Sequence, residues 1–530
     1  MRRWFIAGLA ALLLAPSGIC AQAADEAEAE AIAREVDQAI GRYHLPGIAV
    51  GVVRDGRVIA RITRGETEIG TGEKIDSASV FKIASNSKAM TAALLARLVD
   101  QGKLNWDDPV TRHLPDFRMY EDWVTREIQV RDLLIHNSGL PAGAGDLMLW
   151  PEPNQFTRAD VLHGMRYLQP KWSFRSRYAY DNTLYIVAGE VAAAAGSAPY
   201  ETLMQREVFA PLGLQRCRVG EWNRADLGNV AQPHRRRADR NEVVNRDGET
   251  IAAIPMAAAG GVRCSLDDML RWATVWLQPE VVGVDRQGRP WLSARQRDLA
   301  WQPHVAMPLS PRMREWNRSH YHGYGYGWRL ADVDGTQWVS HTGTLSGMYS
   351  GLILLPEYGI GIVILINGNA DEARTVLMQS LTKHFTAPGR NPGVAGYADW
   401  LAKARASTAP KTGARGVDIA RRRLATRSEL AGLIGIWRDP WFGEIEICPA
   451  KRGVYFRAHK SPRLHGPVMA SGAGWWVEWH DAVATDAWLR LDKTAEGPPR
   501  LLMAKLDPEG DFSDDFEDLQ FTRVAAQCIN

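Results

Sequence analysis

The sequence has few cysteines, and none of them form the close pairs that hold a zinc ion. Its 530 residues contain five cysteines, and those after residue 23 stand far apart, at Cys217, Cys264, Cys448 and Cys528. Zinc sites need cysteine or histidine ligands a few residues apart, often in two such pairs. Other clusters of His, Asp or Glu that could hold a catalytic metal are also missing. We therefore expect no metal and no cofactor.

Long apolar runs and an excess of charge are also lacking. After residue 23 no stretch approaches the ~20 apolar residues that cross a bilayer, so no integral membrane span is expected. The chain carries 63 Lys and Arg against 61 Asp and Glu. Loss of Arg2 and Arg3 with the amino-terminal segment would leave a formally neutral protein. This balance favours neither nucleic acid nor an anionic membrane as a partner.

The amino-terminal residues have the layout of a secretory signal. Met1-Arg2-Arg3 precedes an apolar run, Trp4–Ala15, and then a small-residue cleavage site at Ala21-Gln22-Ala23. We predict a cleaved signal peptide over residues 1–23 and a periplasmic or secreted mature protein. In an oxidising compartment four cysteines allow three pairings. Cys217 with Cys264 and Cys448 with Cys528 is the pairing that needs no contact between domains, and free buried thiols are the alternative.

The length and the order of strand-like segments predict two domains. A chain of this length exceeds the usual size of one hydrophobic core. Two β-rich runs flank Asp55-Gly56, which indicates a hairpin. Further strand-like runs lie between residues 326 and 366, with helical patterns in the middle of the chain. An antiparallel sheet built from both ends of the domain, with helices beside it, gives an α+β fold over residues 24–387.

The remaining sequence predicts a linker and a small all-β domain. Residues 388–428 are rich in Ala, Arg, Gly and Pro, which is typical of a linker with at most a short helix. Residues 429–527 contain short, aromatic-rich runs separated by turn residues, and each run is predicted to be a strand. The runs are Gly443–Ile447, Val454–Ala458, Trp475–Trp479, Ala487–Leu491, Leu501–Leu506 and Glu517–Arg523. That pattern predicts a small β-barrel or sandwich.

A serine and a lysine one helical turn apart are the first candidate for chemistry. Ser85-Asn86-Ser87-Lys88 begins a segment with Leu94, Leu95 and Leu98 at helical spacing. A serine hydroxyl needs a nearby base to act as a nucleophile, and a desolvated lysine can supply it. The same spacing recurs by chance at Ser79 with Lys82 and at Ser380 with Lys383. Only Ser85 has a long helix of small residues directly behind it.

Two later segments supply further polar groups. Tyr180 can pass a proton to a leaving group, and Asn182 can hold a carbonyl or the lysine. The alternative for this pair is a packed tyrosine ring and an asparagine that caps the next helix. The second segment is His341-Thr342-Gly343-Thr344, which follows a predicted strand. Glycine permits close approach of a substrate to the backbone there. A rival Lys411-Thr412-Gly413 lies in the predicted linker with no strand to carry it.

Together, these motifs resemble the class C β-lactamase and DD-peptidase family of serine hydrolases. The likeness covers about Ile32–His384 and includes Leu133–Pro141, Ala259–Arg263 and Gly323–Trp328. The segment after residue 429 resembles the lipocalin-like domain that often follows such hydrolases. In relatives this barrel can cover the active site or mediate assembly, so a homo-oligomer through the barrel is one expectation.

The resemblance implies a role for each motif residue. Ser85 would be acylated, Lys88 would be its main base or proton partner, Tyr180 would relay the proton, and His341 would stand beside the relay. The substrate-binding residues would be Asn182, Thr342, Gly343 and Thr344, and the N–H groups of Ser85 and Thr344 would form the oxyanion hole. Whether Lys88 or Tyr180 takes the first proton stays open.

Histidine in place of the commoner lysine of the Lys-Thr-Gly motif bears on the substrate. A neutral histidine attracts a substrate carboxylate less than lysine does. Family members with this histidine include DD-peptidases and esterase- or aminopeptidase-like enzymes. We therefore expect a peptidase acting on peptides with D-residues, or an esterase. A β-lactamase is the alternative of the same chemistry, and a penicillin-binding sensor that is acylated without turnover is the alternative of another class.

Overall fold

The structure is a computed structural model. It describes residues 17–284, 288–407, 421–472, 474–492 and 498–528, with side chains from residue 24 onward. Residues 1–16, most of the predicted signal peptide, lie outside the described residues, as does the rival Lys411-Thr412-Gly413. None of the described helices is both long and apolar enough to cross a membrane.

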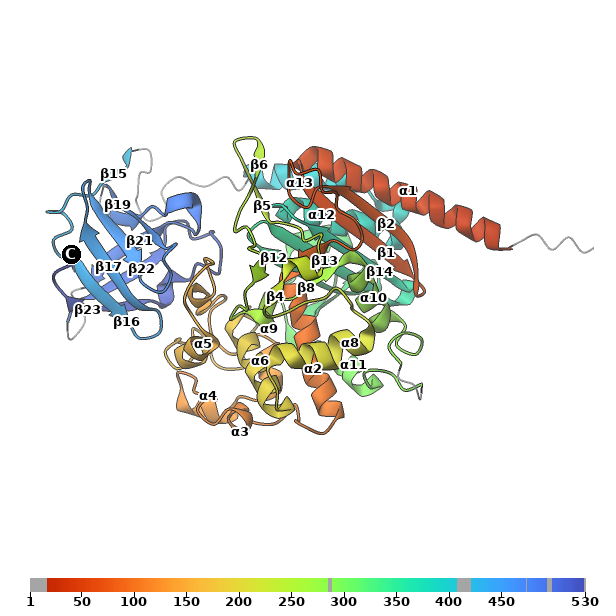
Figure 1. Cartoon of the computed structure of the whole chain (residues 1–530), viewed down its shortest axis with the longest axis horizontal. Coiled ribbons are helices and arrows are strands. Elements are labelled where there is room, and N and C mark those ends of the chain that lie inside the picture. Colours follow the sequence, from red (N-terminus) through yellow and green to blue (C-terminus); the bar gives the residue numbers. More distant parts are fainter. Residues whose placement is uncertain (1–16, 285–287, 408–420, 473, 493–497, 529–530) are drawn as a thin grey trace, which may run out of the picture.

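An eight-stranded antiparallel sheet organises the larger domain (Figure 1). Its order is β2-β1-β14-β13-β12-β11-β10-β9, so the predicted hairpin lies beside strands from the far end of the domain. The sheet is thus built from both ends of the domain, as the sequence predicts. The strands are β1 Gly47–Arg54, β2 Arg57–Gly65, β9 Val305–Ala306, β10 His322–Tyr324, β11 Arg329–Val333, β12 Thr336–Leu345, β13 Met348–Leu355 and β14 Ile360–Ile366.

Both faces of this sheet are covered, because side chains alternate between two hydrophobic clusters. Along β14, Ile362 and Ile364 pack with one cluster, and Val363 and Leu365 with the other. The first cluster lies under three helices, α1 Ser17–Tyr43, α12 Asp371–Thr386 and α13 Gly393–Ser407. Helix α13 falls in the segment predicted as a linker and packs against α1 and α12.

The helical region lies on the other face. Its longer helices are α2 Ser87–Asp100, α5 Arg158–Gly164, α6 Thr183–Gly196, α10 Leu266–Leu277 and α11 Ala294–Ala300. Helix α2 is buried along most of its length, because Ala, Leu and Met dominate it. It packs against α6 and against α9, Ala257–Gly260. The small side chains of α6 and α9 allow these close approaches.

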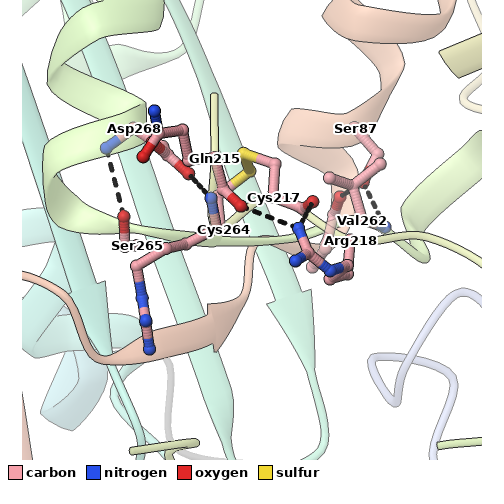
Figure 2. Close-up of a disulfide and its surroundings, with 10 residues drawn as sticks. Ser87, Gln215, Cys217, Arg218, Val262, Cys264, Ser265 and Asp268 are labelled. Carbon is pink, nitrogen blue, oxygen red and sulfur yellow. Dashed lines mark hydrogen bonds between the residues drawn. A yellow bond between two sulfur atoms is a disulfide. The ribbon is translucent and has the colours of Figure 1, made fainter. Parts of the chain in front are cut away.

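A disulfide bridge joins two segments of the helical region, one at Cys217 and the other at Cys264 (Figure 2). Cys217 bonds Cys264 in strand β8, Arg263–Ser265. Just before β8, the N–H of Val262 donates a hydrogen bond to Ser87 Oγ at 3.1 Å. A bridge that closes a loop of 47 residues contributes up to about 4 kcal/mol in the chain-entropy account. The bridge therefore holds β8 in place, and the residue before β8 is hydrogen-bonded to the first residue of α2.

The carboxy-terminal domain is a closed barrel of eight antiparallel strands. Each of β16 to β23 pairs with the next, and β23 closes the ring on β16, while the short β15, Arg423–Leu424, adds to β19. Cys448 bonds Cys528 here, so both predicted pairings are confirmed. The strands are β16 Gly435–Asp439, β17 Gly443–Pro449, β18 Val454–Ala458, β19 His465–Ser471, β20 Gly474–Val477, β21 Ala487–Asp492, β22 Arg500–Lys505 and β23 Gln520–Ala525.

The barrel and the two disulfides bear on two sequence predictions, the all-β carboxy-terminal domain and the location outside the cytoplasm. The predicted all-β domain is confirmed as a barrel, and the lipocalin-like assignment stays a prediction. Both disulfides are compatible with an extracytoplasmic protein, because cytosolic reductants keep most thiols reduced.

Candidate active site

Ser85 lies in a tight turn at the amino-terminal end of α2. A 3₁₀ turn, Ala84–Asn86, leads directly into the helix. Ala84 has φ of 49°, a left-handed conformation that costs a non-glycine residue free energy. Strand β12 contacts this turn, and a side chain on Gly343 would collide with the carbonyl oxygen of Ile83. Glycine is therefore needed at 343 to bring β12 against the serine.

Lys88 projects from the first turn of α2 into the protein interior. Its Nζ lies 3.2 Å from Ser85 Oγ, 2.7 Å from Asn182 Oδ1 and 2.8 Å from the carbonyl oxygen of Ala259. The two latter atoms accept hydrogen bonds and cannot donate them. A neutral amine would use its two hydrogens there and direct its lone pair to Ser85. The geometry suits a base that receives the serine proton.

The electrostatic surroundings of Lys88 favour that neutral form. Burial lowers the pKa of Lys88 to about 7, Asp146 and Asp181 act to raise it, and Arg329 acts to lower it. Asp146 is itself buried and accepts a hydrogen bond from Asn182 Nδ2 at 2.8 Å. This bond orients the amide so that its oxygen faces Lys88. Asn182 makes no capping hydrogen bond with α6, and Asp181 accepts one from the N–H of Leu184 instead.

Tyr180 is buried beside Ser85 and Lys88. Burial raises the pKa of Tyr180 to about 12, while Arg329 and a hydrogen bond with the Ser85 side chain act to lower it. The Lys88 ammonium lies 4.9 Å from the centre of the Tyr180 ring. The structure thus brings Ser85, Lys88, Tyr180 and Asn182 together. At neutral pH the phenol is protonated and can donate a proton to a leaving group.

His341 is buried next to this group but is bonded elsewhere. Its Nδ1 donates to the carbonyl oxygen of Thr342 at 2.8 Å, so its Nε2 accepts from the Tyr324 hydroxyl, also at 2.8 Å. Burial lowers the pKa of His341 well below its usual value, with Arg329 as the next cause. The ring centres of His341 and Tyr180 are 6.4 Å apart. This histidine is therefore held neutral and fixes the start of the Thr342–Thr344 segment.

The two other serine-lysine pairs are not arranged in this way. Ser79 exchanges hydrogen bonds with Asp76, and Lys82 pairs with Asp247. Ser380 contacts Asn391, and Lys383 forms a salt bridge with Asp334. Within the described residues, neither lysine makes a hydrogen bond to its serine. Of these three serines, all in the described part of the chain, only Ser85 has the lysine of its pair in contact with its hydroxyl.

Arg329 is a site residue that the sequence analysis did not single out. It projects from β11 and donates to Thr342 Oγ1 at 2.5 Å, with its guanidinium 5.9 Å from the Tyr180 ring centre. Among the described residues, no carboxylate lies within salt-bridge distance of it. Arg329, Thr342 and Thr344 line the same cavity as Ser85. A guanidinium without a counterion beside the serine suits a ligand carboxylate.

Loops of the barrel complete this cavity. The cavity measures about 720 Å³, and its wall includes residues 481–485 and 511–514 of the barrel. Ser513 Oγ donates to Asp146 Oδ2 at 2.8 Å, and the Phe512 ring centre lies 5.8 Å from that of Tyr180. Gly143 has φ of 79° and lies against the Phe512 backbone, where a side chain would collide. The barrel therefore roofs the cavity and contacts the aspartate that orients Asn182.

Comparisons with known proteins agree with this arrangement. The sequence profile of the family described as Beta-lactamase matches residues 32–383. The unguisins hydrolase ungD' of Aspergillus campestris is 26% identical over 353 residues, which are 63% of this chain and 61% of that protein. Penicillin-binding protein 4 of Amycolatopsis lactamdurans is 27% identical over 336 residues, 62% of this chain and 82% of that protein. The chain thus matches about three fifths of the fungal hydrolase's length.

A solved structure matches almost the whole chain. The octameric penicillin-binding protein homologue from Pyrococcus abyssi aligns with a TM-score of 0.57 at 15% identity. The alignment covers 93% of this chain and 99% of that chain. At this identity the match shows the fold.

Proposed function

The chain belongs to the beta-lactamase family of serine hydrolases, and from that premise we propose that it cleaves peptides or esters through an acyl-enzyme on Ser85. The observation that carries the proposal is the contact between Ser85 and a buried Lys88 whose pKa is lowered to about 7. A base whose pKa lies near the working pH is present in its neutral, proton-accepting form and still binds a proton well.

The proposed reaction uses each group in turn. Lys88 takes the Ser85 proton as Oγ attacks the substrate carbonyl, and backbone N–H groups of Ser85 and Thr344 stabilise the oxyanion. Tyr180 then donates a proton to the leaving nitrogen or oxygen as the carbonyl reforms. The proton that Lys88 took then passes to Tyr180, so both groups return to their starting forms and the serine proton has in effect moved to the leaving group. Water attacks the acyl-enzyme carbonyl and gives one proton to Lys88, which returns it to Ser85 Oγ as the acyl bond breaks.

Arg329 favours a substrate with a free carboxylate on the leaving-group side. It supplies beside Thr342 the positive charge that neutral His341 does not. We therefore propose a peptidase that removes a carboxy-terminal residue, with D-residue peptides as the preferred class. Esters bearing a carboxylate fit the same site.

This proposal predicts a selective effect of Arg329. Wild-type protein should hydrolyse a peptide ending in D-Ala-D-Ala, and Arg329→Ala should lower kcat/KM about 100-fold, the value of a charge-assisted hydrogen bond pair. For the same peptide with an amidated carboxy terminus, Arg329→Ala should lower kcat/KM less than threefold. Rates are measured by chromatographic detection of D-alanine from the free peptide and of D-alaninamide from the amidated peptide, at pH 9, where Lys88 is neutral in both proteins.

The control for this prediction is Arg329→Lys, which keeps the charge but loses the planar fork. It should lose about tenfold on the free peptide. An equal loss on the free and the amidated peptide would contradict the carboxylate assignment. Turnover of β-lactams but not peptides would favour the β-lactamase alternative, and acylation without turnover would favour a penicillin-binding sensor.

We also propose that the protein is secreted or periplasmic and assembles through its barrel. The two disulfides and the octameric state of the Pyrococcus abyssi homologue support this. Light scattering on residues 24–530 should give a mass above one chain, and removal of residues 429–530 should give a monomer. A monomeric longer form would contradict assembly through the barrel.

A further inference from the structure

A buried arginine has no part in the reaction described above. Arg374 lies on α12, the helix that packs on β13. Its side chain is 7% exposed, and it is not among the described residues that line the catalytic cavity. A guanidinium removed from water is costly in free energy unless hydrogen bonds compensate for the loss. The partners of Arg374 therefore indicate what its burial achieves.

Two hydrogen bonds of Arg374 go to the strand segment beside Ser85. Its Nη1 donates to the carbonyl oxygen of Gly343 at 2.7 Å and to Thr344 Oγ1 at 2.8 Å. The other terminal nitrogen, Nη2, donates to Asp371, whose side chain is 70% exposed. An ion pair with so exposed a carboxylate contributes little to stability. The buried contacts of Arg374 are thus those that hold residues 343 and 344.

These contacts reach the cavity through one peptide bond. A peptide unit is planar and trans, so the carbonyl of Gly343 and the N–H of Thr344 point in opposite directions. Arg374 holds the carbonyl oxygen and thereby fixes the direction of the N–H. Strand β11 pairs with β12 only as far as Ser340, so in the described structure the later residues of β12 have a strand on one side alone, β13. This part of β12 therefore depends on side chains to restrain it.

The turn that carries the nucleophile is anchored in a comparable way. Ser350 of β13 donates to the carbonyl oxygen of Ile83 at 2.6 Å and accepts from Asn86 Nδ2 at 2.7 Å. Both bonds are buried, and they flank Ser85, whose N–H is the other proposed oxyanion donor. Each of the two proposed donors is thus adjacent to a backbone carbonyl or turn that a buried side chain holds from behind the cavity.

We propose that Arg374 is a positioning residue that directs the Thr344 N–H toward the oxyanion without contacting the substrate. The inference rests on the proposed function, because the oxyanion forms in that reaction. A purely structural arginine, which only ties α12 to the sheet, would affect stability and leave the chemical step of the folded protein unchanged. The two roles therefore differ in what they do to the transition state.

The first test compares kcat with KM for the peptide ending in D-Ala-D-Ala. Loss of a complete oxyanion donor costs about 100- to 1,000-fold in kcat. A misdirected donor keeps part of its effect, so Arg374→Met should lower kcat about 30-fold. KM should change less than about threefold, because the interaction forms in the transition state. Arg374→Lys keeps one charged donor and should lose only about fivefold in kcat.

The second test does not depend on turnover. A boronic acid binds serine hydrolases as a tetrahedral adduct, in which Ser85 Oγ bonds to boron, Lys88 takes the serine proton and one boron-bound oxygen occupies the oxyanion position. The Kd of phenylboronic acid, measured by calorimetry, should rise about 30-fold in Arg374→Met and about fivefold in Arg374→Lys. Binding of the peptide to Ser85→Ala should change less than threefold when Arg374→Met is added, since no oxyanion forms there.

Arg158→Met is the matched control. Arg158 is also largely buried and pairs with Glu190 and Glu201, but it does not line the cavity among the described residues. Its loss should leave kcat and boronic acid affinity within twofold of wild type. Thermal unfolding is measured on every variant, and if Arg374→Met does not fold, Arg374→Lys carries the test. Unchanged boronic acid affinity in a folded Arg374 variant, or an equal loss in Arg158→Met, would overturn the positioning role.

Turnover separates this inference from the proposed function. If wild type hydrolyses no peptide or ester but binds the boronic acid on Ser85, and Arg374→Met weakens that binding, the positioning role stands and the hydrolase proposal fails. If wild type hydrolyses the peptide and a folded Arg374→Met keeps its kcat, the positioning role is overturned and the hydrolase proposal stands.

Discussion

Replacement of Ser85 by alanine should abolish covalent labelling of the protein by a fluorescent penicillin or fluorophosphonate. The substitution removes the only hydroxyl that contacts both Lys88 and Tyr180 within the described residues. Removal of a nucleophile costs at least about 1,000-fold in rate, because no other group can form the acyl bond. Intact mass spectrometry of residues 24–530 should show the adduct in wild type and the unmodified mass in Ser85→Ala.

Two matched variants control for indirect effects. Ser79→Ala and Ser380→Ala remove the serines of the other two serine-lysine pairs, and both should keep the wild-type label. Ser79 is buried and bonded to Asp76, so thermal unfolding is measured on each variant. Labelling retained in Ser85→Ala, at an intact fold, would contradict the central assignment and direct attention to the residue that carries the adduct.

The fate of an acyl group delivered by a peptide or ester distinguishes an enzyme from an acyl trap. An enzyme loses this acyl group after free substrate is removed, because water hydrolyses the acyl bond, whereas a penicillin-binding sensor keeps it. Loss of the penicillin label itself would favour the β-lactamase alternative, and the phosphonyl label is stable in every case. The barrel loops at residues 481–485 and 511–514 form part of the cavity wall, so they bear directly on whether water can reach the acyl group.

The fold was largely predictable because hydrophobic periodicity is a local signal. The hairpin around Asp55-Gly56 is confirmed as β1 and β2, and the predicted strand Val454–Ala458 matches β18. Strands β16 and β19 were not predicted as strands. β16 pairs with β23 at a register that shifts between Ile436 and Trp437, and β19 contains Gly466 and Pro467, which are poor strand formers.

The candidate site was predictable only where motifs carry it. Ser85, Lys88, Tyr180 and Asn182 lie in recognisable segments, and the structure brings them together. Asp146 and Arg329 lie outside any pattern that indicates a role. Asp146 reaches Asn182 because the preceding loop lies against the start of α6, where Thr183 donates a hydrogen bond to the carbonyl oxygen of Ala144. Arg329 stands out because no carboxylate of the described residues pairs with it. Such relations depend on tertiary packing and leave no trace in spacing.

The contact between the two domains could not be predicted from the sequence either, because it too depends on tertiary packing. Ser513 and Phe512 lie in a loop of the barrel with no catalytic pattern, and their partners, Asp146 and Tyr180, are more than 300 residues earlier. The resemblance to two-domain relatives allowed either a cover or an assembly role for the barrel. Only the three-dimensional arrangement shows which loops line the cavity.

The pH dependence of kcat/KM should follow the protonation of Lys88. Its neutral form accepts the Ser85 proton, and burial lowers its pKa to about 7. Activity should therefore fall about tenfold per pH unit below 7 and level off above it. Arg329 contributes to lowering this pKa. Arg329→Ala should therefore shift the acid limb, the part of the pH profile where kcat/KM falls with falling pH, to higher pH. The limb is measured with the amidated peptide, whose binding does not depend on Arg329.

Lys88→Met tests the same group directly. The apolar side chain fits the buried space without leaving a charge, but no base then contacts Ser85, so kcat/KM should fall at least about 1,000-fold. The remaining activity should lose the acid limb near pH 7. Thermal unfolding in each buffer excludes acid denaturation as the cause of the limb. An unchanged limb in Lys88→Met would assign the titration to another group and make Tyr180 the candidate for the first proton transfer.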